Sequence, residues 1–215
     1  MGVPNRFAIE YPQRCLELMG ALEGYARDKQ LMGSFALLAA ASVLTIPFER
    51  MKAKHPLYKK DKDDQLTEAL KGLEKISFLE APFWQGEPGF WFQTRVMNDI
   101  NDSNNWKDEE GYRPLHDSAK NSIVARKADK VLRPLRNALA HGNIFYLNGD
   151  GYEVAGDQMK LLAFASRYEE SQEQQAESCT FRLIVAREED FFQFVRSWAV
   201  WISQLPASRE ISDAA

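Results

Sequence analysis

The chain has 215 residues, of which 45% are hydrophobic, and a formal net charge of −4. This size and composition fit one globular domain with a substantial core, and the charge excludes a general attraction to nucleic acid, so any basic surface must be local. Cys15 and Cys179 lie far apart without CxxC spacing, which is typical of free thiols in a reducing compartment.

The amino-terminal part of the chain predicts helices. Apolar residues recur at helical spacing over residues 10–28, and the run 33–54 begins apolar on all sides, as in a helix at the centre of a fold. Pro47 should bend this second helix or begin a new segment. The run from Phe35 to Phe48 is shorter than the roughly 20 residues that a membrane crossing needs. Because the first residues also lack the apolar core of a signal peptide, we expect a cytoplasmic protein with no membrane partner.

The middle of the chain alternates helices with polar connections. Residues 55–65 are charged and contain a proline, which indicates a surface connection, and a helical pattern resumes over 66–76. The stretch 82–92 mixes turn formers with five aromatic residues, which either stack on bases or, as we prefer, pack on the core. We expect a further helix over 90–100 and a long surface loop over 101–117.

The carboxy-terminal third has the two-residue period of strands and then returns to a helix. Residues 143–147 and 152–155 predict a β-hairpin around a tight turn. Two more strands are expected over 159–165 and 179–186, with the polar run Ser166–Ser178 between them. The pattern over 188–205 predicts a helix whose broad apolar face packs on the other helices or on a second subunit.

A long helix is expected to begin near Ser118 and to end at His141. Its apolar residues recur at three- and four-residue steps and should be buried: Val124, Ala128, Val131, Leu132, Leu135 and Leu139. Gly142 is the residue that stops it, so His141 lies in the last turn. Asn137 and His141, four residues apart, share the polar face, while Arg136 sits beside the apolar sector.

The same stretch is locally basic. Asp129 is the one acidic residue within a span that contains Lys120, Arg126, Lys127, Lys130, Arg133 and Arg136. Our candidate RNA-binding residues are Lys130, Arg133, Lys127 and Arg126. The alternative is a solvated helix face without a partner, because basic stripes of this kind are common.

The run Arg136-Asn137-x-x-x-His141 resembles the signature of the HEPN superfamily, in which four to six residues separate an arginine from a histidine at the end of a long helix and a polar residue, often Asn, follows the arginine. The helix that ends Thr45-Ile46-Pro47-Phe48-Glu49-Arg50 also looks like the early core helix of some bacterial HEPN families. The resemblance covers roughly residues 30–145.

This resemblance implies a mainly α fold, a HEPN-like antiparallel helical bundle with a small appended antiparallel β-sheet or hairpin. We expect one domain over residues 1–215, with the bundle at about 10–142 and 187–205 and the sheet inserted at about 143–186. Members of the superfamily dimerise through the motif helix, so the resemblance also implies a homodimer.

Many HEPN proteins are metal-independent endoribonucleases, including toxins and defence effectors. His141 exchanges protons near neutrality and is the candidate acid/base, and Arg136 offers a planar fork of donors that matches phosphate oxygens. Asn137 would orient His141 or bind phosphate. The resemblance suggests attack by the RNA 2′-hydroxyl, which leaves a 2′,3′-cyclic phosphate and a 5′-hydroxyl. No cofactor is implied, and the three histidines form no ligand-spaced metal cluster.

Two other interpretations stay open. Some HEPN proteins have lost catalysis, so the chain could be a silent module that binds RNA, a nucleotide or a protein partner such as an antitoxin. It could also be an unrelated helical dimerisation domain, in which His141 caps the last carbonyls of its helix and Arg136 pairs with a carboxylate such as Glu49.

Overall fold

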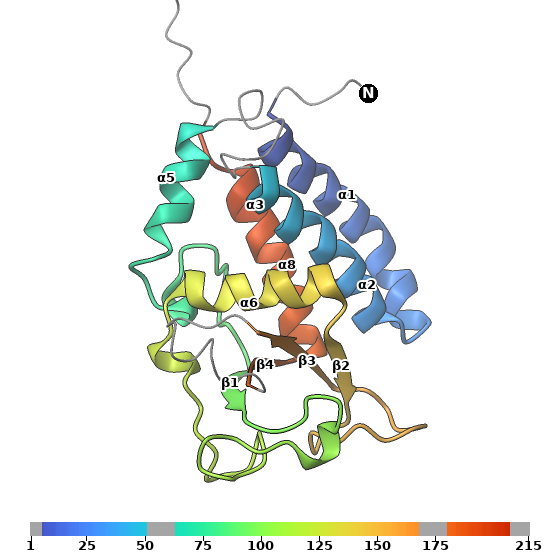
Figure 1. Cartoon of the computed structure of the whole chain (residues 1–215). Helices are drawn as coiled ribbons and strands as arrows, with labels where there is room; N and C mark the ends of the chain where they lie inside the picture. The colour runs from blue at the N-terminus through green and yellow to red at the C-terminus, as the bar shows by residue number, and fades with distance from the viewer. Residues whose placement is uncertain (1–5, 51–62, 168–179, 207–215) are drawn as a thin grey trace, which may run out of the picture.

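A computed structural model describes residues 6–50, 63–167 and 180–206 of the chain. Helices pack on one face of a four-stranded antiparallel sheet (Figure 1). The helices are α1 (Phe7–Asp28), α2 (Met32–Ala40), α3 (Ile46–Arg50), α5 (Asp64–Gly72), α6 (Ala128–His141) and α8 (Glu188–Ser203), and short 3₁₀ turns occur at Phe78–Glu80, Ser103–Asn105 and Ile123–Ala125. The strands, in order across the sheet, are β1 (Trp91–Val96), β4 (Phe181–Arg187), β3 (Leu161–Ser166) and β2 (Ile144–Leu147). The fold is therefore mainly α with a small antiparallel sheet, as the sequence predicts.

The helices α2 and α3 follow one another through a π-helical segment, Ala41–Thr45. Pro47 has no N–H and cannot donate to the carbonyl of Val43, four residues before it. The indole N–H of Trp198 on α8 donates to that carbonyl at 3.0 Å. The expectation that the proline begins a new segment agrees with the start of α3 next to it.

By length and hydropathy the stretch Met32–Arg50 is the one helix among the described residues that could cross a membrane, and 44% of its most apolar window is buried within the fold. Its buried residues Ala36, Ala40 and Val43 belong to the main core, and the stretch contacts α1, α6 and α8. A helix surrounded in this way needs apolar residues on several sides for its own packing.

The helix that carries the arginine and the histidine is shorter than predicted. It begins at Ala128. The preceding residues 118–127 form turns and a short 3₁₀ segment, in which Val124 is 69% exposed. The start of α6 is held by backbone hydrogen bonds that join Phe78 to Arg126 at 2.8 Å and Ala128 to Ile76 at 2.9 Å. From there on the predicted apolar sector is inside the protein, with Leu139 partly buried and the remaining members fully buried: Ala128, Val131, Leu132 and Leu135.

Two predictions for the strands are wrong. Residues 90–100 do not form a helix but contain β1, which pairs with β4. One strand of the sheet therefore lies outside the predicted insertion. The predicted hairpin is not formed either, because 152–155 is not a strand and β2 pairs instead with β3. The strands predicted over 159–165 and 179–186 correspond to β3 and β4.

Both faces of the sheet are covered. Phe164 and Ile184 lie on the face that packs against α6 and α8. Val185 lies on the other face, where the predicted polar loop folds over the sheet and inserts Trp106, which is 2% exposed. The sequence prediction of a loop there is confirmed, and its tryptophan gives it a core of its own.

The aromatic stretch over residues 82–92 contributes to the main core. Phe83 is fully buried, with its ring centroid 5.5 Å from that of Trp198 and 5.6 Å from that of Phe194. Trp91 is 4% exposed. The preferred prediction, packing on the core, is confirmed for these residues.

Two helices begin close to where the sequence places them. The helix α5 is capped by Asp63, whose carboxylate accepts the N–H of Leu66 at 2.9 Å, and α8 begins at the predicted residue, Glu188. Most of the predicted connection 55–65, most of the polar run before β4 and Cys179 lie outside the described residues. Cys15 is half-buried, and burial raises the pKa of its thiol.

Candidate active site

The end of α6 presents a histidine to solvent. Gly142 has a left-handed φ of +71° and its N–H bonds to the carbonyl of Ala138, while the N–H of Asn143 bonds to the same carbonyl at 3.0 Å. This is the glycine stop that the sequence predicts. His141 occupies the last turn and is exposed.

His141 lines a hollow between the end of α6 and the end of β3. Five residues line this His141 hollow: Asn137, His141, Asn143, Ser166 and Arg167. The sheet brings them together, because the N–H of Ala165 bonds to the carbonyl of Asn143 at 3.0 Å and so holds the end of β3 beside the exit of α6. The hollow therefore combines an imidazole, two amides, a hydroxyl and a guanidinium.

Arg136 lies on the other side of Asn137. Its Nη2 donates to Oδ1 of Asn137 at 3.3 Å, its Nε lies 3.8 Å from Oε1 of Glu49, and its guanidinium lies 5.6 Å from the ring centroid of Phe48. Burial lowers the pKa of Arg136, while Glu49 raises it and Arg133 lowers it further. Because an arginine titrates far above neutrality, the side chain keeps its charge at physiological pH.

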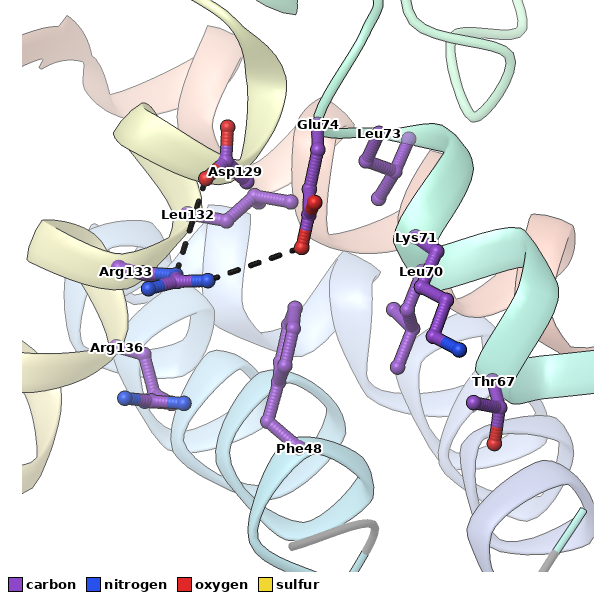
Figure 2. Close-up of a pocket in the computed structure, with 10 residues that line it drawn as sticks. All are labelled: Phe48, Thr67, Leu70, Lys71, Leu73, Glu74, Asp129, Leu132, Arg133 and Arg136. Atoms are coloured by element: carbon purple, nitrogen blue, oxygen red, sulfur yellow. Dashed lines mark ion pairs between the residues drawn. The ribbon is translucent and has the colours of Figure 1, made fainter.

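A second hollow opens in front of Arg136, between α3, α5 and α6 (Figure 2). This Arg136 hollow has a volume of about 390 Å³ and is lined by Phe48, Thr67, Leu70, Lys71, Leu73, Glu74, Asp129, Leu132, Arg133 and Arg136. The ring of Phe48 stands at its centre, with the two arginines on one side and Lys71 on the other. Arg136 and His141 thus line separate hollows, and Asn137 connects them.

The four candidate RNA-binding residues do not share one surface. Arg133 lines the Arg136 hollow, with nitrogens 3.8 Å from Asp129 and 3.9 Å from Glu74. Lys130 lies 4.0 Å from Asp129. Both cations therefore lie next to the same carboxylate, Asp129, whose side chain is only 12% exposed.

The other two candidates precede α6 rather than lying on it. The ammonium group of Lys127 donates to the carbonyl of Lys75 at 2.9 Å, which ties the start of α6 to the segment before it. Arg126 lines a different hollow at the edge of β1. The predicted basic stripe is therefore divided among several surfaces, because the helix that was expected to carry it begins at Ala128.

Sequence reasoning missed the residues that β3 brings to the site. Ser166 ends this strand and Arg167 follows it, 25 or more positions after the histidine, and neither belongs to a motif. Only the pairing of β3 with β2 could have placed them beside α6. Asn143 follows the glycine stop directly, so its short separation of two residues from His141 was the one signal available in the sequence.

No group of three or more His, Cys, Asp and Glu side chains is arranged to hold a metal ion within the part of the chain that the structure describes. The exposed His116 lies in the loop over the sheet, where its ring stacks on Tyr112 at 5.5 Å. It belongs to neither hollow next to α6.

A family model described as HEPN pEK499 p136 matches residues 1–207, which is nearly the whole chain. No curated protein and no solved structure matches the chain. The match extends well beyond the stretch that resembles HEPN proteins by its motif, and it confirms the superfamily that the sequence predicts. The chain belongs to the HEPN pEK499 p136 family.

Proposed function

We propose that this protein is a metal-independent endoribonuclease of HEPN type. The observation that carries the proposal is the contact between Arg136 and Asn137, because it connects the guanidinium to the hollow in which His141 is exposed. A phosphodiester that lies over Asn137 would have a fixed cation on one side and a proton-exchanging group on the other. These are the two elements that metal-free cleavage of RNA requires.

In the proposed reaction the RNA itself supplies the nucleophile. The 2′-hydroxyl loses its proton to a base and its oxygen attacks the adjacent phosphorus, while the bond to the 5′-oxygen breaks and that oxygen takes up a proton. The products are a 2′,3′-cyclic phosphate and a 5′-hydroxyl. His141 takes part in proton transfer, and Arg136 stabilises the negative charge on the phosphoryl oxygens.

A homodimer through α6 completes this proposal. One chain supplies one histidine, whereas separate proton acceptor and donor groups need two. A two-fold axis next to the exposed end of α6 would bring a second His141 to the same phosphate. Ala140 is exposed beside His141 and is small enough for the partner helix to approach closely.

We place the activity in the cytoplasm, where a toxin or defence effector meets cellular RNA. An antitoxin or another protein partner would then restrain it. This part of the proposal comes from the family, in which many members have such roles, and not from the geometry of the site.

A catalytically silent module that binds RNA, a nucleotide or a protein is the second candidate. The pairing of Arg136 with Glu49 favours it, because a carboxylate 3.8 Å from the guanidinium competes with a phosphate for the same charge. If Arg136 served only to hold α3 against α6, Glu49 would be the one partner that it needs.

Cleavage of RNA in the presence of EDTA distinguishes the two candidates. We expect the wild type to cleave RNA, and Arg136→Ala and His141→Ala to lose at least about a hundredfold in rate, the usual contribution of an acid/base group or a charge-stabilising group. Arg136→Lys keeps the charge but loses the fork and should be intermediate. His116→Ala removes an exposed histidine outside the site and is the matched control. Equal rates in all five proteins would refute the nuclease.

A further inference from the structure

The Arg136 hollow has an apolar part that the proposed cleavage does not use. A phosphate needs cations, and Arg136 supplies one, but four of the ten residues that line the hollow are apolar: Phe48, Leu70, Leu73 and Leu132. A volume of about 390 Å³, with apolar walls and a few convergent polar groups, is typical of a site for a small organic group. The hollow therefore suits a ligand that is apolar over its body and polar along one edge.

The ring of Phe48 offers its edge to such a ligand. Trp198 stacks on this ring with 12° between the planes, and the guanidinium of Arg136 lies over it, 5.6 Å from its centroid. Phe48 is half-buried and stands at the centre of the hollow (Figure 2). Aromatic groups favour edge-to-face contacts, and guanidinium groups pack on flat aromatic systems. A planar aromatic ligand therefore fits this position better than an aliphatic one.

Arg136 has donors left for a ligand. Its guanidinium carries several N–H donors in a planar fork, and its side chain is 17% exposed. Within the described residues its one hydrogen bond runs to Asn137 at 3.3 Å, since Glu49 at 3.8 Å lies beyond hydrogen-bond distance. Asn137 also lines the His141 hollow. One ribose joins a base to its phosphate, so a phosphate at the contact between Arg136 and Asn137 brings the neighbouring base within reach of the Arg136 hollow.

A guanidinium and a carboxylate lie next to each other on the wall of the hollow. Nη2 of Arg133 is 3.9 Å from Oε1 of Glu74, and the two side chains are 44% and 55% exposed. This distance, and the 3.8 Å between Arg133 and Asp129, are too long for hydrogen bonds. Arginine donates to O6 and N7 of guanine, and a carboxylate can accept the adjacent N1–H and N2–H. Among the RNA bases, guanine is the one that has an acceptor beside two such donors on one edge.

We propose that the Arg136 hollow binds the base of a nucleotide next to the scissile phosphate and that it prefers guanine. This inference rests on the proposed function for RNA as the ligand. The phosphate lies at the contact between Arg136 and Asn137, and the flat base packs on the edge of Phe48. Arg133 and Glu74 bind the polar edge of the base. The hollow then selects the sequence at which the RNA is cut.

The bases at the cut sites test this preference. The wild type is incubated with a pool of RNA of random sequence, and sequencing of the 5′-hydroxyl products together with the uncut pool identifies the bases that flank each cut. At one of the two flanking positions we expect guanine to be cut about tenfold faster than the other bases, which is within the range for a two-bond contact to a base. Glu74→Ala should reduce this preference to less than about twofold.

The matched control is Glu68→Ala, which removes the same charge from an exposed position on α5 outside the hollow. Its base preference and its cleavage rate should equal those of the wild type. Equal rates for all four bases in the wild type would overturn the proposal. An unchanged preference in Glu74→Ala, or the same loss in Glu68→Ala, would overturn it too.

Binding of guanosine 5′-monophosphate tests the hollow without cleavage. We expect this nucleotide to shift the methyl NMR signals of Leu70, Leu73 and Leu132, which line the hollow, but not those of Leu18, which is exposed on α1. Glu74→Ala should weaken its affinity about tenfold, and uridine 5′-monophosphate should bind the wild type several-fold less tightly. Signals of the three leucines that do not move at any nucleotide concentration would contradict the proposal.

The failure of the proposed function gives a different result. If the wild type cleaves no RNA but guanosine 5′-monophosphate binds in a way that depends on Glu74, the guanine site remains, on a module without catalysis. If cleavage depends on His141 but shows no base preference, and the leucine signals do not move, the nuclease remains and this base site is removed.

Discussion

The hydrogen bond from Trp198 to the carbonyl of Val43 should be coupled energetically to Pro47. The proline leaves this carbonyl without the backbone donor that it would have in a regular α-helix, and the indole N–H takes that place at 3.0 Å. The ring of Trp198 also stacks on Phe48 at a centroid distance of 5.5 Å, with 12° between the ring planes. Trp198 thus fixes the position of α3, and α3 in turn places Phe48 and Glu49 next to Arg136.

The change Trp198→Phe removes the donor and part of the ring. A buried carbonyl left without a partner costs about 1–3 kcal/mol, and the lost ring volume costs roughly 1 kcal/mol more, a fraction of a full truncation to alanine. We therefore expect a loss of about 2–4 kcal/mol in the free energy of unfolding. In a Pro47→Ala background residue 47 has an N–H that can donate to Val43, so the same change should cost only about 1 kcal/mol.

Urea unfolding of the four proteins, followed by far-ultraviolet circular dichroism, measures this coupling directly. The expected coupling free energy is about 1–3 kcal/mol. The control Trp201→Phe removes a similar ring from the same helix, and its cost should not depend on residue 47. Additivity of Trp198→Phe and Pro47→Ala within about 0.5 kcal/mol would refute the reasoning.

Three further substitutions test single features. Glu49→Gln removes the carboxylate next to Arg136, so RNA affinity measured by anisotropy should rise several-fold at low salt. This gain in affinity should vanish at high salt. The absence of a gain at low salt would mean that the arginine does not reach the RNA. Gln93 is fully buried, and among the described residues neither its side-chain oxygen nor its nitrogen has a hydrogen-bond partner. Gln93→Met should therefore raise the free energy of unfolding by about 1–3 kcal/mol, whereas a decrease would indicate a bound water. Burial raises the pKa of Glu188 above its unfolded value, so this group favours folding at low pH and loses that contribution as the pH rises through the folded pKa. Glu188→Gln should therefore melt higher than the wild type at neutral pH, and the difference should disappear below about pH 4.

Local signals in the sequence were enough for the end of α6. The spacing of its apolar residues and the glycine stop both act within a few residues, and the structure has Gly142 at φ +71°. The strand β1 could not be recognised, because all six of its residues are buried and the two-residue alternation is absent. Its centre, Gln93-Thr94-Arg95, is also polar, so the sequence shows neither the alternation nor the continuous apolar run that indicates a strand.

The predicted hairpin failed for a tertiary reason rather than a local one. Its turn exists, since the N–H of Gly151 bonds to the carbonyl of Asn148 and the N–H of Asn148 bonds to the carbonyl of Tyr152. The residues after the turn are exposed, with Val154 at 48%, whereas all of β3 is buried. The chain pairs β2 with the strand that buries more apolar surface. The site residues Ser166 and Arg167 depend on that choice and were therefore out of reach of the sequence.

The separation of Arg136 and His141 into two hollows has a consequence for how many chains make one active site. Within one chain a phosphate over Asn137 meets one imidazole, so the opposite proton transfer falls to water or to a second His141 across a two-fold axis. Mixing wild type with an excess of His141→Ala distinguishes these cases. If two histidines act together, activity follows the square of the wild-type fraction, because mixed dimers are inactive. If one chain suffices, activity follows the fraction itself, and the proposed dimer through α6 is not needed for the reaction.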